Sequence, residues 1–258
     1  MGVEGAGAAL LLTLVAGGAT GIGGLLAMMI KKPQARYLSF ALGLSAGVMI
    51  YVSFLELLPR SIEDAGEVEG VLAFFAGIVL VGAIDWIIPE QENPHHCTLI
   101  MDEKGFANDK MLMRTGMMAA MAIAIHNFPE GMSVFGVALS DLELGGLIAV
   151  AIAIHNIPEG IAVAMPLLYG SGSRRKALWY STLSGLAEPA GAMIGFAILL
   201  PFLSESVIGL TLGFVAGVMV YVSVDELLPA AHRYGHGHST ILGIVLGMAV
   251  MAITLLFM

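Results

Sequence analysis

Residues 46–59 read AGVMIYVSFLELLP, and residues 216–229 read AGVMVYVSVDELLP, so one stretch of the chain recurs after 170 residues. Both copies lie inside long apolar runs that continue on either side. Extending the same spacing outward aligns the first part of the chain, about 6–88, with the last part, about 177–258. A separate pair of apolar runs, at 115–169, lies between them.

The composition identifies the environment of these runs. Of the 258 residues, 58% are hydrophobic and only 12% are charged, and the mean hydropathy is +0.90. This apolar content exceeds what the core of a soluble protein requires. We therefore expect an integral membrane protein, with the lipid bilayer as its solvent and the cell membrane as its location.

Apolar runs of about 20 residues are long enough to cross a hydrocarbon core of roughly 30 Å. The sequence contains eight of them, at about 6–30, 37–59, 71–88, 115–140, 145–169, 177–201, 206–229 and 240–258. The first is expected to remain as a membrane helix, because its front end carries Glu4 and no Lys or Arg, unlike a secretory signal peptide. We expect an all-α fold in which 1–258 form a single transmembrane domain.

The basic residues predict the orientation of the helices. Ten of the eleven fall on one side of the predicted membrane and leave Arg60 on the other; they are Lys31, Lys32, Arg36, Lys104, Lys110, Arg114, Arg174, Arg175, Lys176 and Arg233. The positive-inside rule makes the side with ten residues cytoplasmic. Both termini are then expected outside.

The repeat is predicted to be inverted. Its two best-matched helices are the second and the seventh, and because five steps separate them they cross the membrane in opposite directions. The arrangement is three helices, two central helices and three helices again. Inverted repeats with a substrate site at their interface are typical of transporters.

The central pair carries a second, shorter repeat. Residues 123–135 read IAIHNFPEGMSVF and residues 152–164 read IAIHNIPEGIAVA, with nine of thirteen positions identical. Each copy falls near the middle of its predicted helix. A short loop joins the two helices and makes them antiparallel neighbours, so the two motifs are expected to meet at the bilayer midplane.

Within each copy the polar residues lie close together on the helix. His126 is four residues before Glu130 and Asn127 is three residues before it, so both lie beside the carboxylate while pointing in different directions. The proline of each copy is expected to kink its helix and to free the backbone carbonyl four residues earlier. One carboxylate is then able to serve two neighbouring ligand sets.

These side chains have the chemistry of a metal site. Imidazole, carboxylate and amide oxygen together suit Zn2+, Fe2+, Mn2+, Co2+ or Cd2+. The run at 177–201 adds Glu188, again near midspan and again beside a proline. An ionisable group at this depth costs about 3 kcal/mol or more unless it is paired or coordinated. The alternative interpretation is a purely structural network of hydrogen-bonded carboxyl groups.

With doubled HNxPEG motifs on consecutive helices and an acidic residue on the next, the chain resembles the ZIP family of divalent-metal transporters, most closely its bacterial ZupT-type branch. The resemblance implies uptake of Zn2+, and often of Fe2+ and other divalent ions, into the cytoplasm through two adjacent metal sites. It assigns His126, Glu130, His155 and Glu159 to the first site, and Asn127, Asn156 and Glu188 to the second, with Glu130 and Glu159 bridging. It also suggests Met49 as a soft contact to the second site, although most of the 17 methionines are expected to fill space.

The resemblance further implies a movement of the predicted helices, counted in chain order. The first, fourth, fifth and sixth move together against the second, third, seventh and eighth. The small residues GGATGIGG at 17–24 permit such sliding, and they equally fit a tight static contact. The remaining histidines, His95, His96, His232, His236 and His238, fall in predicted cytoplasmic loops, where they either hold metal or are simply solvated.

Two other classes of function fit parts of this pattern. An intramembrane metalloenzyme would place similar groups at the midplane, but the HExxH signature is absent from the sequence. A proton-coupled carrier of organic anions would need Arg or Lys within a helix centre, and the sequence places none there. We expect no enzyme activity, no resident cofactor and no nucleic-acid partner. The partners are divalent ions and the bilayer, and the sequence leaves a homodimer open.

Overall fold

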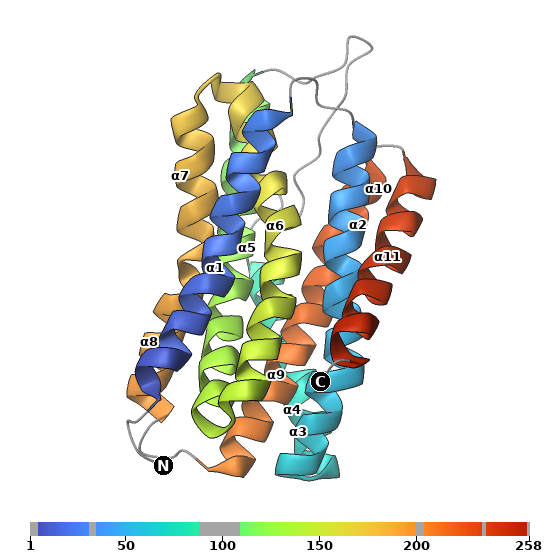
Figure 1. Cartoon of the computed structure of the whole chain (residues 1–258). Helices are drawn as coiled ribbons and strands as arrows, with labels where there is room; N and C mark the ends of the chain where they lie inside the picture. Colours follow the sequence, from blue (N-terminus) through green and yellow to red (C-terminus); the bar gives the residue numbers. More distant parts are fainter. Residues whose placement is uncertain (1–4, 31–34, 88–108, 200–203, 234–235, 257–258) are drawn as a thin grey trace.

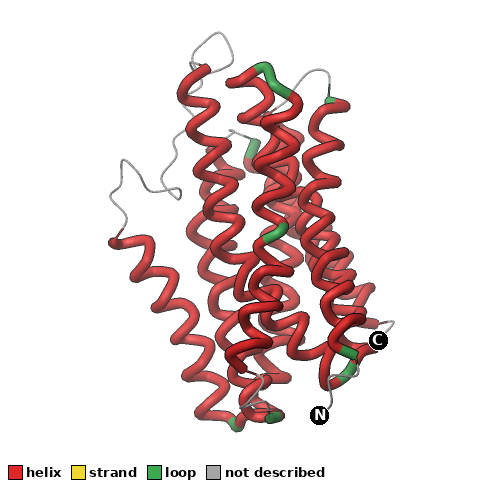
Figure 2. Tube along the Cα trace, turned by 90° about the vertical axis from the view of Figure 1, so that its left-hand side faces the viewer, coloured by secondary structure: helices red, strands yellow, loops and turns green. Residues whose placement is uncertain are grey.

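The computed structural model describes residues 5–30, 35–87, 109–199, 204–233 and 236–256. Within these ranges the chain forms helices joined by short connections, and no strand (Figure 2). The α-helices are α1 (Ala6–Met29), α2 (Ala35–Val52), α3 (Leu58–Ala65), α4 (Glu67–Ile87), α5 (Asp109–Ser140), α6 (Leu142–Ser171), α7 (Arg174–Gly185), α8 (Ala187–Leu199), α9 (Glu205–Val222), α10 (Leu228–Arg233) and α11 (Gly237–Leu256). Two π-helical turns, η1 (Ser53–Leu57) and η4 (Ser223–Leu227), join α2 to α3 and α9 to α10.

The two copies of the long repeat have the same local structure. Each begins as an α-helix, passes through a π-helical turn and continues as a second α-helix. At the start of each turn a serine hydroxyl donates to the carbonyl four residues earlier: Ser53 to Met49 and Ser223 to Met219, both at 2.7 Å. Such bonds compete with the helix ladder and bend it, which explains why the same sequence produces the same irregularity twice.

Packing of the repeats is also equivalent. A side chain at Gly47 would strike the carbonyl of Ile244, and a side chain at Gly217 would strike the carbonyl of Phe74. The contact residue Ile244 lies 170 residues after Phe74, as Gly217 lies 170 after Gly47. Close backbone approach therefore joins α2 to α11 and α9 to α4 in the same way, as small residues allow.

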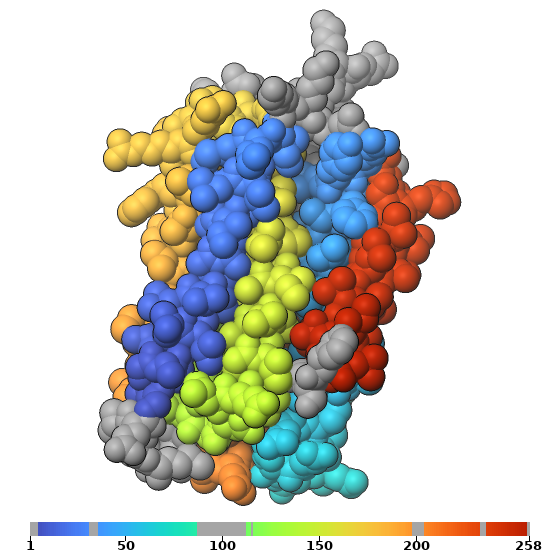
Figure 3. Space-filling view, viewed as in Figure 1, coloured from blue at the N-terminus to red at the C-terminus, as the bar shows by residue number. Residues whose placement is uncertain are grey.

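The helices pack in two groups. One contains α1 and α5 to α8; the other contains α2 to α4 and α9 to α11. Figure 1 shows the first group on the left and the second on the right. The main contacts between groups are α2 with α6 and α5 with α9. Figure 3 shows α1, α6, α2 and α11 side by side across one face.

Six described helices are long and apolar enough to cross a membrane: Ala6–Met29, Arg36–Ala65, Glu67–Trp86, Leu142–Ser171, Glu205–His232 and Gly237–Leu256. The chain is a multi-pass membrane protein. Only 22% of the apolar stretch of α4, and 22% of that of α11, is buried inside the protein. Lipid covers exposed apolar faces of this kind, so their exposure does not require a second copy of the chain. The homodimer stays a prediction.

The predicted helix at 177–201 is not continuous. It is divided at Leu186 into α7 and α8, each too short to span a bilayer alone. The break has a local cause, because Pro189 has no backbone N–H to offer to the carbonyl of Gly185 and its ring crowds that carbonyl. By contrast, α5 continues through Pro129 and α6 through Pro158, so the expected kinks at these prolines stay a prediction.

The two ends of the bundle carry different charged side chains. α1 begins and α11 ends at the same end (Figures 1 and 2). This end also carries the turn between α5 and α6, where Asp141 caps α6 by accepting from the N–H groups of Glu143 and Leu144 at 3.0 Å. The opposite end carries the start of α7, with Arg174, Arg175 and Lys176.

Candidate metal site

The two HNxPEG motifs meet in the interior between α5 and α6. His126 Nε2 lies 3.2 Å from Glu159 Oε2, and His155 Nε2 lies 3.2 Å from Glu130 Oε1. All four side chains are buried. Each histidine therefore faces the glutamate of the other motif, and the two pairs cross between the helices.

The two crossed pairs differ in their hydrogen bonding. His126 and Glu159 have hydrogen-bond geometry. The ion-pair contact between His155 Nε2 and Glu130 Oε1 is less well aligned, and His155 Nδ1 and Glu130 Oε2 have no partner. Unsatisfied buried groups of this kind are rare and call for a functional explanation. Lone pairs on imidazole and carboxylate in one interior are the donors that a divalent ion requires.

The motif asparagines are held by their amide nitrogens. Asn156 Nδ2 donates to the carbonyl of Ala16 at 3.0 Å, and Asn127 Nδ2 donates to the carbonyl of Ser184 at 3.3 Å. Both Oδ1 atoms are buried without a hydrogen-bond partner. The amide oxygens are thus the atoms left available to a cation.

Glu188 reaches the same interior from α8. Asn156 Nδ2 also donates to its Oε1, while its Oε2 is buried without a hydrogen-bond partner. The Nδ2 of Asn127, which was expected on the same site, bonds to Ser184 of α7, and its place in the second site stays a prediction. The structure therefore brings Asn156 into direct contact with Glu188 of α8 and places Asn127 beside α7.

The glycine of each motif has a packing role that the sequence analysis did not assign. A side chain at Gly131 would strike the carbonyl of Glu188, and one at Gly160 would strike the carbonyl of Thr20. α8 and α1 are therefore able to approach α5 and α6 next to the two motif glutamates. Spacing alone could have suggested this role, because a glycine in mid-helix usually marks a close approach.

A further site residue, Ser45 of α2, was also missed. Its hydroxyl donates to Glu159 Oε1 at 3.0 Å and lies 3.9 Å from Met49 Sδ. Ser45 and Met49 are fully buried and one turn apart on α2. Met49 therefore lies next to a hydroxyl that touches the site, and its own role as a ligand stays a prediction. The only signal in the sequence is a hydroxyl one turn before Met49 in an apolar run.

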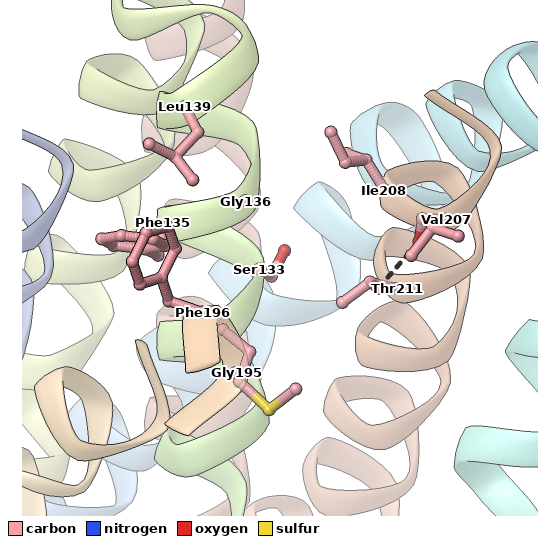
Figure 4. Close-up of a pocket in the computed structure, with 10 residues that line it drawn as sticks. Ser133, Phe135, Gly136, Leu139, Gly195, Phe196, Val207, Ile208 and Thr211 are labelled. Atoms are coloured by element: carbon pink, nitrogen blue, oxygen red, sulfur yellow. Dashed lines mark hydrogen bonds between the residues drawn. The ribbon is translucent and has the colours of Figure 1, made fainter. Parts of the chain in front are cut away.

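The two groups of helices lie close together on the side of the metal site that faces the α5–α6 turn. A hollow of about 20 Å3 lies between α5, α8 and α9, enough for about one water molecule. Figure 4 shows Ser133 of α5 among its apolar neighbours with its side chain directed toward α9, and the Ser133 hydroxyl is buried without a partner. Thr211 on the facing helix bonds its own backbone at Val207.

On the other side of Pro129 the gap between the two groups is wider. A hollow of about 410 Å3 is bounded by α4, α5 and α9, and only apolar residues line it: Leu80, Val81, Ile84, Met121, Ala124, Ile125, Phe128, Pro129 and Val218. None of the candidate ligands belongs to it.

Within the described residues, no three His, Cys, Asp or Glu side chains are arranged as a ready-made metal-holding group. The donors instead contact one another in pairs.

The histidines predicted in loops are a separate set. His95 and His96 lie outside the described residues. His232 is exposed in α10, where its Nδ1 lies 2.8 Å from the carbonyl of Leu228.

Comparison with known proteins shows similarity to zinc transporters over most of the chain. A model described as ZIP zinc transporter matches residues 87–255. The chain is 54% identical over 259 residues to zinc transporter ZupT of Chlorobium phaeovibrioides, covering 97% of both chains. It is 52% identical over 254 residues to zinc transporter ZupT of Corynebacterium glutamicum, covering 95% of this chain and 97% of that one, and 50% identical over 258 residues to that of Akkermansia muciniphila, covering 95% and 96%.

Proposed function

The chain belongs to the family of ZIP zinc transporters, and on this premise we propose that it takes up Zn2+ across the cell membrane into the cytoplasm. The observation that carries the proposal is the crossed pair of contacts between His126 and Glu159 and between His155 and Glu130. Ionisable side chains at the centre of a bundle in lipid are rare and costly, and even when they pair with one another they typically mark the pathway of an ion.

The proposed substrate site holds two ions. His126, His155 and the two motif glutamates form the first position, and Asn127, Asn156 and Glu188 complete the second, with Glu130 and Glu159 bridging. The unpartnered oxygens of Asn156 and Glu188 support the second position. Fe2+ is proposed as a further substrate, because nitrogen and oxygen donors accept several divalent metals and geometry and availability decide among them.

The proposed topology has eight spans in a three, two, three arrangement with both termini outside. Two spans beyond the six apolar ones are α5, which carries polar site residues, and the divided pair α7 and α8. The equivalent contacts of Gly47 and Gly217 support an inverted repeat. The basic start of α7 then faces the cytoplasm.

The membrane potential suffices as a driving force. At about 100 mV it contributes roughly 2.3 kcal/mol per charge, and so about 4.6 kcal/mol for a divalent ion moving inward. Metal binding also requires deprotonated carboxylates and neutral imidazoles, so uptake is expected to depend on pH.

The test is uptake by purified protein in liposomes that enclose a Zn2+-sensitive dye. We expect uptake that saturates with Zn2+ concentration and increases when a potassium diffusion potential makes the interior negative. Empty liposomes are the control. If the folded protein gives no Zn2+ uptake above that control, the transport proposal is wrong, and a structural network of the buried carboxyls becomes the favoured interpretation.

A further inference from the structure

Ser45 is set apart from the other partners of the site by its position in the fold. It belongs to α2, in the second group of helices, whereas Glu159 belongs to α6, in the first. The hydrogen bonds of the motif asparagines, from Asn127 to Ser184 and from Asn156 to Glu188, stay inside the first group. The hydrogen bond from Ser45 to Glu159 crosses the boundary between the groups.

The hydroxyl has one hydrogen and two neighbours. The carboxylate oxygen of Glu159 lies at 3.0 Å and the sulfur of Met49 at 3.9 Å. Since a carboxylate is a much stronger acceptor than a thioether, the hydrogen is directed to Glu159. Ser45 therefore holds Oε1, and His126 faces Oε2.

The corresponding carboxylate lacks such a partner. Glu130 Oε1 lies 3.2 Å from His155 Nε2, but neither oxygen of Glu130 receives a hydrogen bond from a hydroxyl of the second group. The long repeat places Val215 at the position equivalent to Ser45, 170 residues later, on α9, which packs against α5. A valine has no hydroxyl to donate, so the two motif glutamates are chemically unequal although their motifs are nearly identical.

From this geometry we propose that Ser45 is a positioning residue for metal binding: it fixes the Glu159 carboxylate so that Oε2 is presented to an ion beside His126. Groups that hydrogen-bond a ligating carboxylate orient it, and their loss typically lowers metal affinity by about 10- to 100-fold. This proposal rests on the proposed function, because it takes Zn2+ as the ion that Glu159 binds.

The test is Ser45→Ala, with Zn2+ affinity measured on purified protein by competition with a chelating dye. We expect the dissociation constant of the tighter Zn2+ position to rise about 10-fold or more, without loss of bound ions at saturation. In liposomes the KM should rise while kcat stays within about twofold, as expected when ground-state and transition-state binding weaken equally. Ser45→Thr keeps the hydroxyl and should restore most of the affinity.

The matched control is Ser53→Ala. Ser53 is a buried serine on the same continuous span, and its hydroxyl bonds only the backbone of its own helix, at Met49. It should leave Zn2+ affinity within about twofold. Thermal unfolding of the metal-free proteins separates misfolding from weakened binding.

Two results would overturn the positioning role. One is unchanged Zn2+ affinity in folded Ser45→Ala protein; the other is an equal loss in Ser53→Ala, which would indicate general damage to the span. Neither result bears on the transport proposal. That proposal is wrong only if the unmodified protein takes up no metal.

Discussion

The carboxylate of Glu159 on α6 lies 3.2 Å from the imidazole of His126 on α5. The mirror contact joins Glu130 of α5 to His155 of α6. A glutamate removed from either helix therefore also leaves a buried histidine on the other helix without its partner. The two motifs are coupled through these contacts.

Replacing Glu159 with alanine is expected to abolish Zn2+ uptake. The change removes the proposed bridging carboxylate and leaves His126 buried without its acceptor. Uptake in liposomes should fall to the level of empty vesicles, and Glu130→Ala should have the same effect. His236→Ala is the control, because His236 is exposed at the start of α11 and far along the chain from the motifs. Near-normal uptake by folded Glu159→Ala protein would contradict the shared-carboxylate site.

Glu188→Gln is expected to lower bound Zn2+ from about two ions per chain toward about one. Glutamine keeps the size of the side chain and its hydrogen bond with Asn156, but it removes the charge that the second position needs. The measurement is metal content per folded chain after equilibration with excess Zn2+ and removal of free ions. If both ions remain, Glu188 is a packing residue, and the first position and the transport proposal stand.

The sequence predicted the helical class and the repeat for a clear physical reason. Lipid requires about 20 apolar residues per span, so length and hydropathy alone locate most helices. The 170-residue offset is reflected in the equivalent contacts that Gly47 and Gly217 make in the structure. The π-helical turns at Ser53 and Ser223 were not anticipated, because they depend on serine hydroxyls that compete with the backbone.

The partners inside the site could be predicted only in part. Spacing along one helix placed His126 beside Glu130, yet the contact in the structure runs to Glu159, because α5 and α6 pack face to face at the motifs. Such a choice depends on the distance between helices, which no local pattern contains. Ser45 was missed for the same reason: its relation to Glu159 joins residues 114 positions apart.

The orientation is testable with single cysteines. In a Cys97→Ser background, Glu67→Cys should react with a membrane-impermeant maleimide added to intact cells, because Glu67 is exposed at the start of α4, at the end predicted to face out. His236→Cys, exposed at the start of α11, should react only after the cells are opened. The reverse pattern would place both termini in the cytoplasm.

The equivalent packing of the two repeats is testable through two glycines, one on α4 and one on α11. A side chain at Gly77 of α4 would strike the carbonyl of Phe214, and one at Gly247 of α11 would strike the carbonyl of Leu44. The two contacts are equivalent under the 170-residue repeat. We therefore expect Gly77→Ala and Gly247→Ala to destabilise the protein by similar amounts, about 1 to 3 kcal/mol each, as is typical of overpacking.

The measurement is thermal unfolding of purified protein in one detergent, with the two variants and a control compared at equal concentration. Gly18→Ala is the control, because nothing lies within 4 Å of a side chain built there. In mid-helix that change should raise stability slightly, since alanine loses less conformational entropy than glycine. A fall in melting temperature for one outer glycine but not for its equivalent would show that the two halves do not pack alike. Equal falls, with the control unchanged or raised, are what equivalent packing of the two repeats requires.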